Sequence, residues 1–483
     1  MSQTASRKYQ FCLRLRLASQ LLACGLSAGA FAADEVPAAA SCPPRDVPCA
    51  AEPATSSSAP VEASGEDGQS DRWNVHFQST YVWQQKEAFH APYKGPQSLE
   101  TERERGYSLS LTAFVGLRLW NGGEFYVDPE GFEGVPFSHL YGLASIQNGE
   151  LQKNGGPELK TYWARAFLRQ TIDLGGESFH VDDGANQLAS DYTKQRVVLT
   201  LGRISLPDIF EKSRYANDPR SQFMNWALIT HGAWDFAADA RSYTVGAAAE
   251  VYWNDWAIRG GRFMEPTVAN GTRLDFNIMR HHGDQIEVEH THSIKGLPGS
   301  FRVLVFRNEA DAGSYRDAIN AALASGGVPD VTSVRKDAAK HGIGVSFDQS
   351  VTADTAVFIR ASYADDKVEE YAFTEIDNTV SAGASTKGSA WERPDDTVGF
   401  AFASSGLNKD HFDYLAAGGL GGFLGDGQLT HYGRERVLEA YYNWQVRKGA
   451  WLTFDLQQIV NPGYNADRRG PVNVFGGRLH VEL

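Results

Sequence analysis

The sequence predicts an all-β fold, a transmembrane antiparallel β-barrel of about 16 strands, and three observations support this prediction. Apolar and polar residues alternate along most of the chain after Trp73, which is the periodicity of strands rather than helices. Many of these stretches run for about 10 to 13 residues, longer than ordinary strands and long enough to cross a bilayer. Short turns and longer polar loops follow one another between them, as they do in membrane barrels.

The composition narrows the alternatives. The chain has 483 residues, 42% of them hydrophobic, and a mean hydropathy of −0.37. After the N-terminus it contains no run of about 20 apolar residues, which excludes a multi-helix membrane protein. The formal net charge of −14 makes nucleic acid a poor partner, because nucleic acid binding needs a basic surface. A soluble all-β protein and a membrane barrel remain.

Residues 1–32 have the layout of a secretory signal peptide. They contain four basic residues and no acidic one, an apolar run from Leu17, and a small-residue cleavage site that ends at Ala32. A lipoprotein-like site at Cys24 is less favoured because too few apolar residues precede it, and a buried N-terminal helix is the remaining alternative. Removal of residues 1–32 takes four of the 45 basic and none of the 59 acidic residues, so the net charge changes from −14 to −18.

Residues 33–72 are rich in Ala, Pro and Ser and contain no aromatic residue. Such a segment buries too little apolar surface to fold, so we expect a flexible periplasmic extension. Cys42 and Cys49 lie within it and are the candidate disulfide of an oxidising compartment. Their spacing does not fit a metal motif. The main fold, expected at 73–483, contains no cysteine.

The alternation assigns the strands in order. The first covers 73–83, and in the second every odd position from 107 to 119 is apolar. Further strands, 16 to 18 in all, are expected near 123–130, 162–170, 195–206, 242–254, 256–265, 284–294, 299–309, 341–351, 353–365, 371–389, 396–406, 437–448, 450–461 and 472–483.

Two features of the predicted strands favour a barrel over a soluble sandwich: the aromatic residues at their ends and the last strand of the chain. Aromatic residues such as Trp253 and Trp256 lie at strand ends, where membrane interfaces concentrate them. The strand at 472–483 is expected to close the sheet and leave no open edge. The apolar positions change parity within it, which predicts a bulge at Gly476 and Gly477.

Three arginines lie opposite apolar rows, so we expect them to point into a water-filled lumen. A charge on the lipid face near the midplane would cost about 2–4 kcal/mol. Arg118 opposes the apolar row of the second strand, whereas Tyr162 begins the apolar face of the strand that carries Trp163, Arg165 and Arg169 on its other face. Contact with a solute and pairing with acids across the lumen both remain open for these arginines.

Three passages resemble the carbohydrate-selective porin family (OprB type). The first is Gly-Arg-Ile-Ser-Leu-Pro-Asp-Ile-Phe at 202–210 with 214–235, the second is Gly-Ser-Ala-Trp-Glu-Arg-Pro-Asp-Asp at 388–396 with 414–419, and the third is Glu-Ala-Tyr-Tyr at 439–442 with 457–468. The resemblance implies a 16-stranded outer-membrane barrel of a Gram-negative-type envelope. Through it, mono- or small oligosaccharides would diffuse passively into the periplasm, without cofactor, metal or chemical step. It leaves open whether the barrel is a monomer or a homo-oligomer such as a trimer.

The passage 203–241 mixes the groups that a sugar-selective pore needs, which are polar groups for hydroxyls and aromatic faces for the ring. We expect part of it to fold inward as a constriction loop. Besides the three lumen arginines, the candidate sugar contacts are Arg203, Asp208, Arg214, Asn217, Asp218, Arg220, Asn225, Trp226, Trp234 and Asp235. For each of them, bracing of the loop against the wall is an equally good interpretation.

Several other motifs resemble functional sites but do not meet the requirements of those sites, and two alternative functions remain to be weighed. The histidines at 281, 282, 290 and 292 do not converge on one face, so no metal site is expected there. The Gly-rich stretch 418–427 lacks the Lys-Ser/Thr of a phosphate loop, and 314–325 is expected to be a short loop helix. A general porin remains the main alternative function. An outer-membrane barrel enzyme is less favoured because no Ser–His constellation is evident.

Overall fold

The computed structural model describes residues 72–153, 156–365, 367–373 and 375–483. The predicted signal peptide (1–32), the extension (33–72) apart from Arg72, and the predicted disulfide of Cys42 with Cys49 lie outside the described residues.

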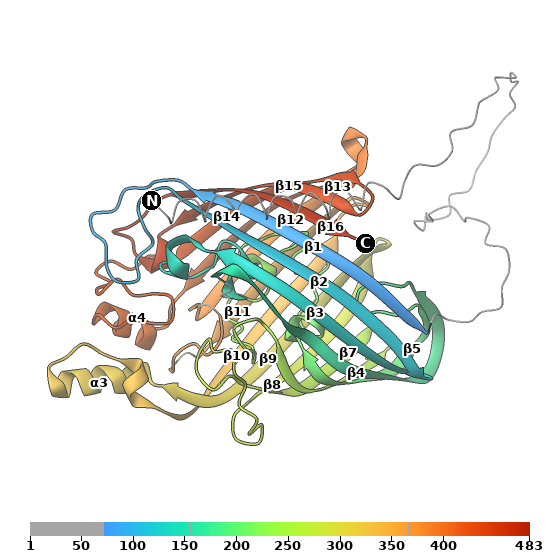
Figure 1. The fold of residues 1–483 in the computed structure, drawn as a ribbon, viewed down its shortest axis with the longest axis horizontal. Coiled ribbons are helices and arrows are strands. Elements are labelled where there is room, and N and C mark those ends of the chain that lie inside the picture. Colours follow the sequence, from blue (N-terminus) through green and yellow to red (C-terminus); the bar gives the residue numbers. More distant parts are fainter. Residues whose placement is uncertain (1–71, 154–155, 366, 374) are drawn as a thin grey trace, which may run out of the picture. The chain divides into compact units, whose positions relative to one another are not determined.

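Sixteen strands within the described residues form a closed antiparallel barrel (Figure 1), which confirms the predicted fold class. Each strand pairs with its neighbours in sequence, and β1 also pairs with β16, from Gln78 opposite Glu482 to Lys86 opposite Val474. The strands are β1 (Trp73–Lys86), β2 (Glu104–Trp120), β3 (Gly123–Val135), β4 (Gly156–Val181), β5 (Ser190–Ile204), β6 (Thr244–Trp253), β7 (Trp256–Met264), β8 (His282–Ile294), β9 (Leu297–Gly313), β10 (Arg335–Ser350), β11 (Thr355–Ala364), β12 (Asn378–Gly388), β13 (Arg393–Gly406), β14 (Glu435–Arg447), β15 (Ala450–Val460) and β16 (Val472–Glu482).

The helices are short and lie in the connections. They are α2 (Trp226–Ile229), α3 (Tyr315–Ser325), α4 (Lys409–Ala416) and the 3-10 helices η1 (Phe137–Leu140), η2 (Gly149–Lys153), η3 (Leu206–Asp208), η4 (Val331–Val334), η5 (Ser389–Trp391) and η6 (Pro462–Tyr464). The predicted loop helix at 314–325 is confirmed as α3, which the side chain of Ser314 caps by accepting the Asp317 N–H. None of the helices in the described part of the chain has both the length and the apolar character needed to cross a membrane.

Short and long connections alternate around the barrel, as predicted. Seven short connections lie at one end, hereafter the short-turn end: 121–122, 182–189, 254–255, 295–296, 351–354, 389–392 and 448–449. The longer connections lie at the other end, the long-loop end, where Figure 1 shows α3 and α4 on the left. In membrane barrels the short turns face the periplasm and the long loops face outward.

The two faces of the strands separate apolar from polar residues. On β1, Trp73 and Val75 are exposed on the outside, whereas Thr80 and Gln84 are buried on the inside. Trp253 and Trp256 flank a two-residue turn at the short-turn end and are 54% and 52% exposed. An outward apolar face with aromatic residues at the strand ends is what a lipid-facing barrel surface needs.

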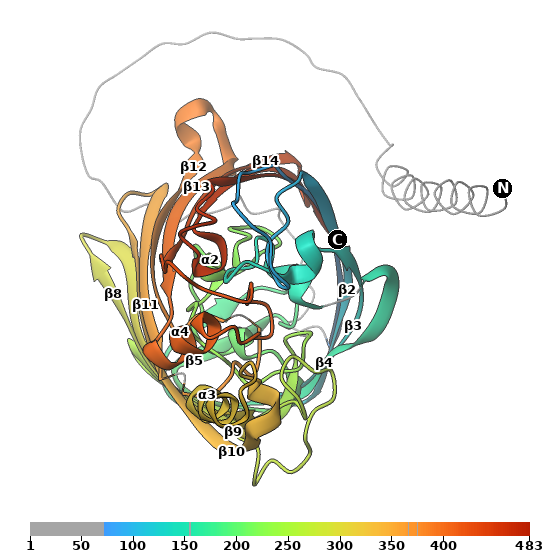
Figure 2. The ribbon, with the colours of Figure 1, turned by 90° about the vertical axis from the view of Figure 1, so that its left-hand side faces the viewer.

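The connection 205–243 runs inside the barrel, as Figure 2 shows from the long-loop end. Two of its backbone N–H groups, those of Met224 and Asn225, donate to the Glu439 carboxylate of β14 at 2.6 and 2.9 Å. The rings of Trp226 and Phe236 pack against Phe373, with centroid distances of 4.9 and 4.3 Å. The loop is therefore fixed by hydrogen bonds to the wall and by an apolar core of its own.

The predicted faces of the strand at 162–170 are partly wrong. Asp128 lies opposite Arg165, but Pro129 lies opposite Trp163, so the register shifts by one residue at Ala164. Trp163 therefore points outward and is 62% exposed, while Tyr162 points inward. A proline has no N–H for the ladder, and a bulge is where a strand tolerates one.

Two further predictions about strands are wrong. No register shift occurs at Gly476 or Gly477, which lie opposite Asp455 and Phe454 in regular order. The change of parity arises because Val472 and Val474 point inward and are fully buried, so an apolar residue there does not mark the lipid face. The predicted strand 371–389 is shortened, since its first residues belong to the connection 365–377 that precedes β12.

Candidate functional site

The inward loop borders two cavities inside the barrel. The central cavity, of about 280 Å³, is lined by residues of the loop, of η2 and of β1, β2 and β4, among them Phe114, Gln152, Lys153, Arg165, Asp208, Asn217, Asp218, Arg220, Trp226, Thr230 and Tyr243. The rim cavity, of about 500 Å³, lies toward the short-turn end and is lined by Arg214, Tyr215, Ser221, Gln222, Asp354, Ser385, Lys387, Thr397, Tyr441, Asn443, Trp451, His480 and Glu482.

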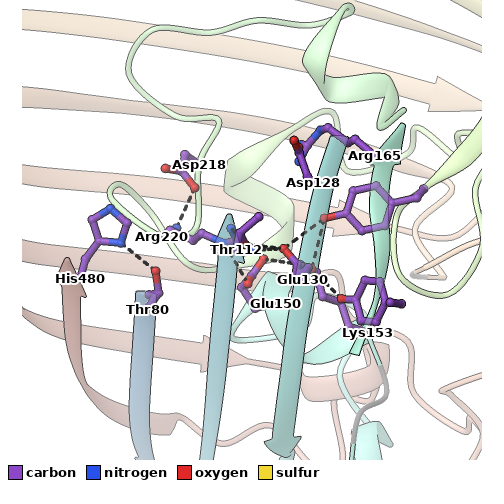
Figure 3. Close-up of polar contacts among 12 residues, drawn as sticks. Thr80, Thr112, Asp128, Glu130, Glu150, Lys153, Arg165, Asp218, Arg220 and His480 are labelled. Atoms are coloured by element: carbon purple, nitrogen blue, oxygen red, sulfur yellow. Dashed lines mark hydrogen bonds and ion pairs between the residues drawn. The ribbon is translucent and has the colours of Figure 1, made fainter. Parts of the chain in front are cut away.

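A buried network of charges forms one wall of the central cavity (Figure 3). The Glu130 carboxylate accepts hydrogen bonds from Arg220 Nη2 and Lys153 Nζ, both at 2.8 Å. Glu150 binds the same two cations, with Arg220 Nε at 3.0 Å and Lys153 Nζ at 3.3 Å. The hydroxyls of Tyr162 and Tyr243 also donate to Glu130. Buried charges need such partners because an uncompensated one is costly.

A second ion pair joins the barrel wall to the inward loop. The Arg165 guanidinium donates to both oxygens of Asp208, at 2.6 and 2.7 Å, and lies 3.3 Å from Asp128. Its guanidinium carbon is 5.3 Å from the Tyr243 ring centroid. Asp208 belongs to η3 and also accepts the N–H of Ser205. A bidentate pair of this kind fixes the position of both partners.

Three side chains of the central cavity carry a buried polar atom that has no hydrogen-bond partner among the described residues. They are Nε1 of Trp226, Oγ1 of Thr230 and Oε1 of Gln152. Trp226 is 3% exposed. A buried indole N–H normally finds a partner, so these three atoms are exceptions that the surrounding side chains leave unsatisfied.

Asn217, Asp218 and Arg214 occupy the loop segment between the two cavities. The Asn217 amide donates to the Glu211 carbonyl at 2.9 Å, and the Asp218 carboxylate accepts from the Arg220 N–H and the Ser221 hydroxyl. Within the described residues the exposed guanidinium of Arg214 makes no ion pair, and it lines the rim cavity.

Four predicted site residues brace the loop, as the alternative interpretation allowed. Asn225 caps α2 and donates to Gln457 at 3.1 Å, and Trp234 donates to Gln285 at 2.8 Å. The Asp235 carboxylate is 3.0 Å from Lys340 Nζ, and the Arg203 guanidinium is 2.5 Å from the Asp239 carboxylate.

Arg118 and Arg169 hold the connection 182–189 at the short-turn end. Arg118 donates to the Ala189 carbonyl at 2.8 Å and to the Ser190 hydroxyl at 2.5 Å. Arg169 donates to the Asn186 carbonyl at 2.9 Å. Both lie on the interior face of the barrel, and Arg118 Nη2 is also 3.4 Å from the Glu124 carboxylate, so each braces this connection or the adjoining wall.

Sequence reasoning missed the acidic partners of the cations that line the central cavity. Asp128 and Glu130 are two residues apart in β3 and face inward. The rule that assigned the lumen arginines, which is that a charge inside a membrane strand faces the lumen, could have found both. Nothing in the sequence pointed to Glu150 or Lys153, because they lie in a loop and reach the site only through the fold.

One cluster in the described part of the chain has the spacing of a metal site. Single ligand atoms of Glu370, Asp377 and His411 lie within 4.8 Å of one another at the long-loop end. Although burial opposes it, Asp377 and Glu375 raise the pKa of His411 to about 10. A metal-binding imidazole must be neutral, so a metal ion would have to displace the proton that these carboxylates favour. We interpret the cluster as an ion-paired anchor between α4 and the connection that precedes β12.

The closed barrel, its lipid-facing exterior and its polar interior define an outer-membrane porin. The OprB family of carbohydrate-selective porins matches residues 105–483. The chain belongs to this family, whose members are outer-membrane channels for carbohydrates.

Comparison with one solved structure supports the fold. The high-pH structure of Pseudomonas putida OprB has a TM-score of 0.66 and 18% identity, over 85% of this chain and 94% of that chain. The low-pH structure of the same protein gives a TM-score of 0.45 and 14% identity, over 85% and 92% of the two chains. The DcaP channel of Acinetobacter baumannii gives 0.46 and 10%, over 86% and 99%. A search of curated proteins finds no significant match.

Proposed function

We propose that small neutral sugars cross this barrel by passive diffusion through the central cavity, without a chemical step. The observation that supports this best is the mixed lining of the cavity, where the polar side chains of Arg165, Asp208 and Asn217 lie beside the aromatic rings of Phe114 and Tyr243. Sugar hydroxyls would bind the polar side chains, and the apolar ring face would lie against the aromatic ones. A cavity of about 280 Å³ is at the small end for ligand sites, which favours single sugar rings.

The Arg165–Asp208 pair is proposed to set the opening of this cavity. Both residues line it, and Asp208 is on the loop while Arg165 is on the wall. The pair is held by two hydrogen bonds, so its groups are already placed when a sugar arrives. Binding must stay weak enough for release in any conducting pore.

Liposome swelling tests the proposal directly. Liposomes that contain the full-length protein are placed in glucose, in a larger oligosaccharide and in a non-sugar solute of the same size as glucose. We expect glucose to enter faster than the matched solute and the oligosaccharide to enter slowest. Equal rates for glucose and the matched solute would sink the proposal and leave a general pore.

A pair of variants localises the selectivity. Arg165→Ala should lower the glucose-to-solute ratio about fivefold, the effect of losing roughly 1 kcal/mol of hydrogen bonding. Arg280→Ala is the matched control. Arg280 lies on an exposed loop and makes the same bidentate contact with Asp337 of β10. It should leave the ratio unchanged. If both variants behave alike, the Arg165–Asp208 pair has no role in selection.

An enzymatic role finds little support in the interior. Among the described residues, Thr80, His480 and Glu482 are arranged like a catalytic triad, with Thr80 Oγ1 2.7 Å from His480 Nδ1 and His480 Nε2 2.9 Å from Glu482 Oε1. Thr80 is only 1% exposed, so its hydroxyl is closed to a lipid ester. A lipolytic assay of the same liposomes should therefore be negative.

A further inference from the structure

We propose that the rim cavity is a second binding subsite for neutral sugars, which receives the sugar as it leaves the central cavity toward the periplasm. The inference rests on the proposed function, because it assumes that sugar traverses the central cavity. It assigns a role to residues of β12–β16, a part of the wall that contains none of the predicted contact residues.

The two cavities are neighbours. The loop segment 214–222 contributes to both, since Arg214, Tyr215 and Gln222 line the rim cavity while Asn217 and Arg220 line the central one. They also approach each other at the barrel wall, where Gln78 of the central cavity lies opposite Glu482 of the rim cavity in the β1–β16 pairing. A sugar that passes this segment moves from one cavity into the other.

The rim cavity offers hydrogen-bonding groups that the protein itself does not use. Among the described residues, the side chains of Arg214, Ser385, Lys387 and Thr397 make no hydrogen bond or ion pair, although all four line the cavity. Asn443 uses its amide oxygen to accept from Thr453, and its amide nitrogen donates to no described residue. These groups can bind sugar hydroxyls without breaking an existing contact.

Aromatic side chains supply the second half of a sugar site. The Trp451 ring is 5.7 Å from the His480 ring, and both line the cavity. Tyr215 is held by a 2.8 Å hydrogen bond between its hydroxyl and that of Ser350. Fixed aromatic rings beside free hydroxyl and amide groups suit a ligand with an apolar ring face and a polar edge.

The charges of the rim cavity favour a neutral ligand. Two cations, Arg214 and Lys387, and two acids, Asp354 and Glu482, line it. Neither sign predominates, so an anionic or cationic solute gains no net attraction there. With about 500 Å³, the cavity is larger than the central one and can accept a sugar in more than one orientation.

Protection of introduced thiols tests this subsite. All four native cysteines precede residue 50, so a background with Ser at these positions leaves the barrel unchanged. Ser385→Cys then reports on the rim cavity and Ser242→Cys on the central cavity. Ser333→Cys, on an exposed long loop, is the control. Each full-length variant is reconstituted in liposomes and labelled with a small thiol reagent, with and without glucose.

The proposal expects glucose to slow labelling at Ser385→Cys and Ser242→Cys, by about half when half of the sites are occupied, and to leave Ser333→Cys unaffected. Trp451→Leu should then reduce protection at Ser385→Cys and not at Ser242→Cys. If Ser385→Cys fails to fold, Thr397→Cys on the neighbouring strand replaces it.

The outcomes separate the two proposals. Protection at Ser242→Cys alone overturns the rim subsite and leaves the proposed function intact. Protection at neither position, together with loss of sugar selectivity in swelling, overturns both. Equal protection at Ser385→Cys by glucose and by a size-matched non-sugar solute also overturns the subsite, because it shows only that a solute fills the space.

Discussion

The central and rim cavities share one loop segment but use their charges in opposite ways. In the central cavity each of Lys153, Arg165 and Arg220 is held by at least one carboxylate. In the rim cavity Arg214 and Lys387 have no such partner among the described residues. The first set is buried or half-buried, and the second is exposed to the lumen.

The difference follows from solvation. A charge removed from water needs a compensating partner, because leaving it unpaired costs several kcal/mol. A charge that faces a water-filled space needs none, and pairing it adds little. The paired charges therefore fix the shape of the constriction, whereas the unpaired ones remain available to a passing solute.

The largest expected effect on stability comes from the paired charges of the central cavity. Glu130→Gln would leave Lys153 and Arg220 short of one buried carboxylate, and we expect a loss of about 3–5 kcal/mol of unfolding free energy. The measurement is denaturant unfolding of the protein in lipid vesicles. Glu158→Gln, at an exposed position near the long-loop end of β4, is the control and should change little. Similar values for the two variants would show that the buried network gives no net stabilisation.

The sequence predicted the barrel and much of its interior face, because period-two alternation reports which side of a strand meets lipid. The prediction was wrong where an apolar residue points inward or where the strand register shifts. Val472 and Val474 are apolar and point inward because the loops form an apolar core there. Tyr162 and Trp163 exchange faces because a bulge opposite Pro129 shifts the register.

The inward loop was predictable as a region but not residue by residue. Its mixture of charged and aromatic residues indicated a constriction, yet Trp234 and Asp235 brace the loop while Asn217 and Trp226 line the central cavity. Their roles depend on partners such as Gln285 and Lys340, which are distant in sequence and come together only in the closed barrel.

His411 is a buried cation that can lose its proton, so pH can test whether paired buried charges stabilise the fold. His411, like Arg220, is buried between two carboxylates, here of Asp377 and Glu375. Its pKa is raised from 6.5 to about 10, so its contribution to stability is complete below about pH 6.5 and is lost as the pH rises toward 10. Proteolysis within the connection 407–434 should therefore become faster over this range.

The matched control is His431→Gln, because His431 belongs to the same connection but its side chain is 69% exposed beside Asp467. This variant should keep the pH dependence of the wild type. His411→Gln should be cleaved faster at pH 7 and should lack the additional rise toward pH 10. A wild type cleaved at the same rate throughout would show that the His411 ion pairs do not anchor the connection.

The smallest effect on stability is expected from the unpaired charges of the rim cavity. Arg214→Gln removes a guanidinium that no described carboxylate holds, so the unfolding free energy should stay within about 0.5 kcal/mol of the wild type. Protection of Ser385→Cys by glucose should nevertheless weaken, because a donor facing the rim cavity is lost. A stability loss comparable to that of Glu130→Gln would mean that Arg214 braces the fold as Arg220 does, and the distinction between the two cavities would fail. Unchanged stability with weaker sugar protection would show that the same loop segment carries structural charges on one side and solute-binding charges on the other.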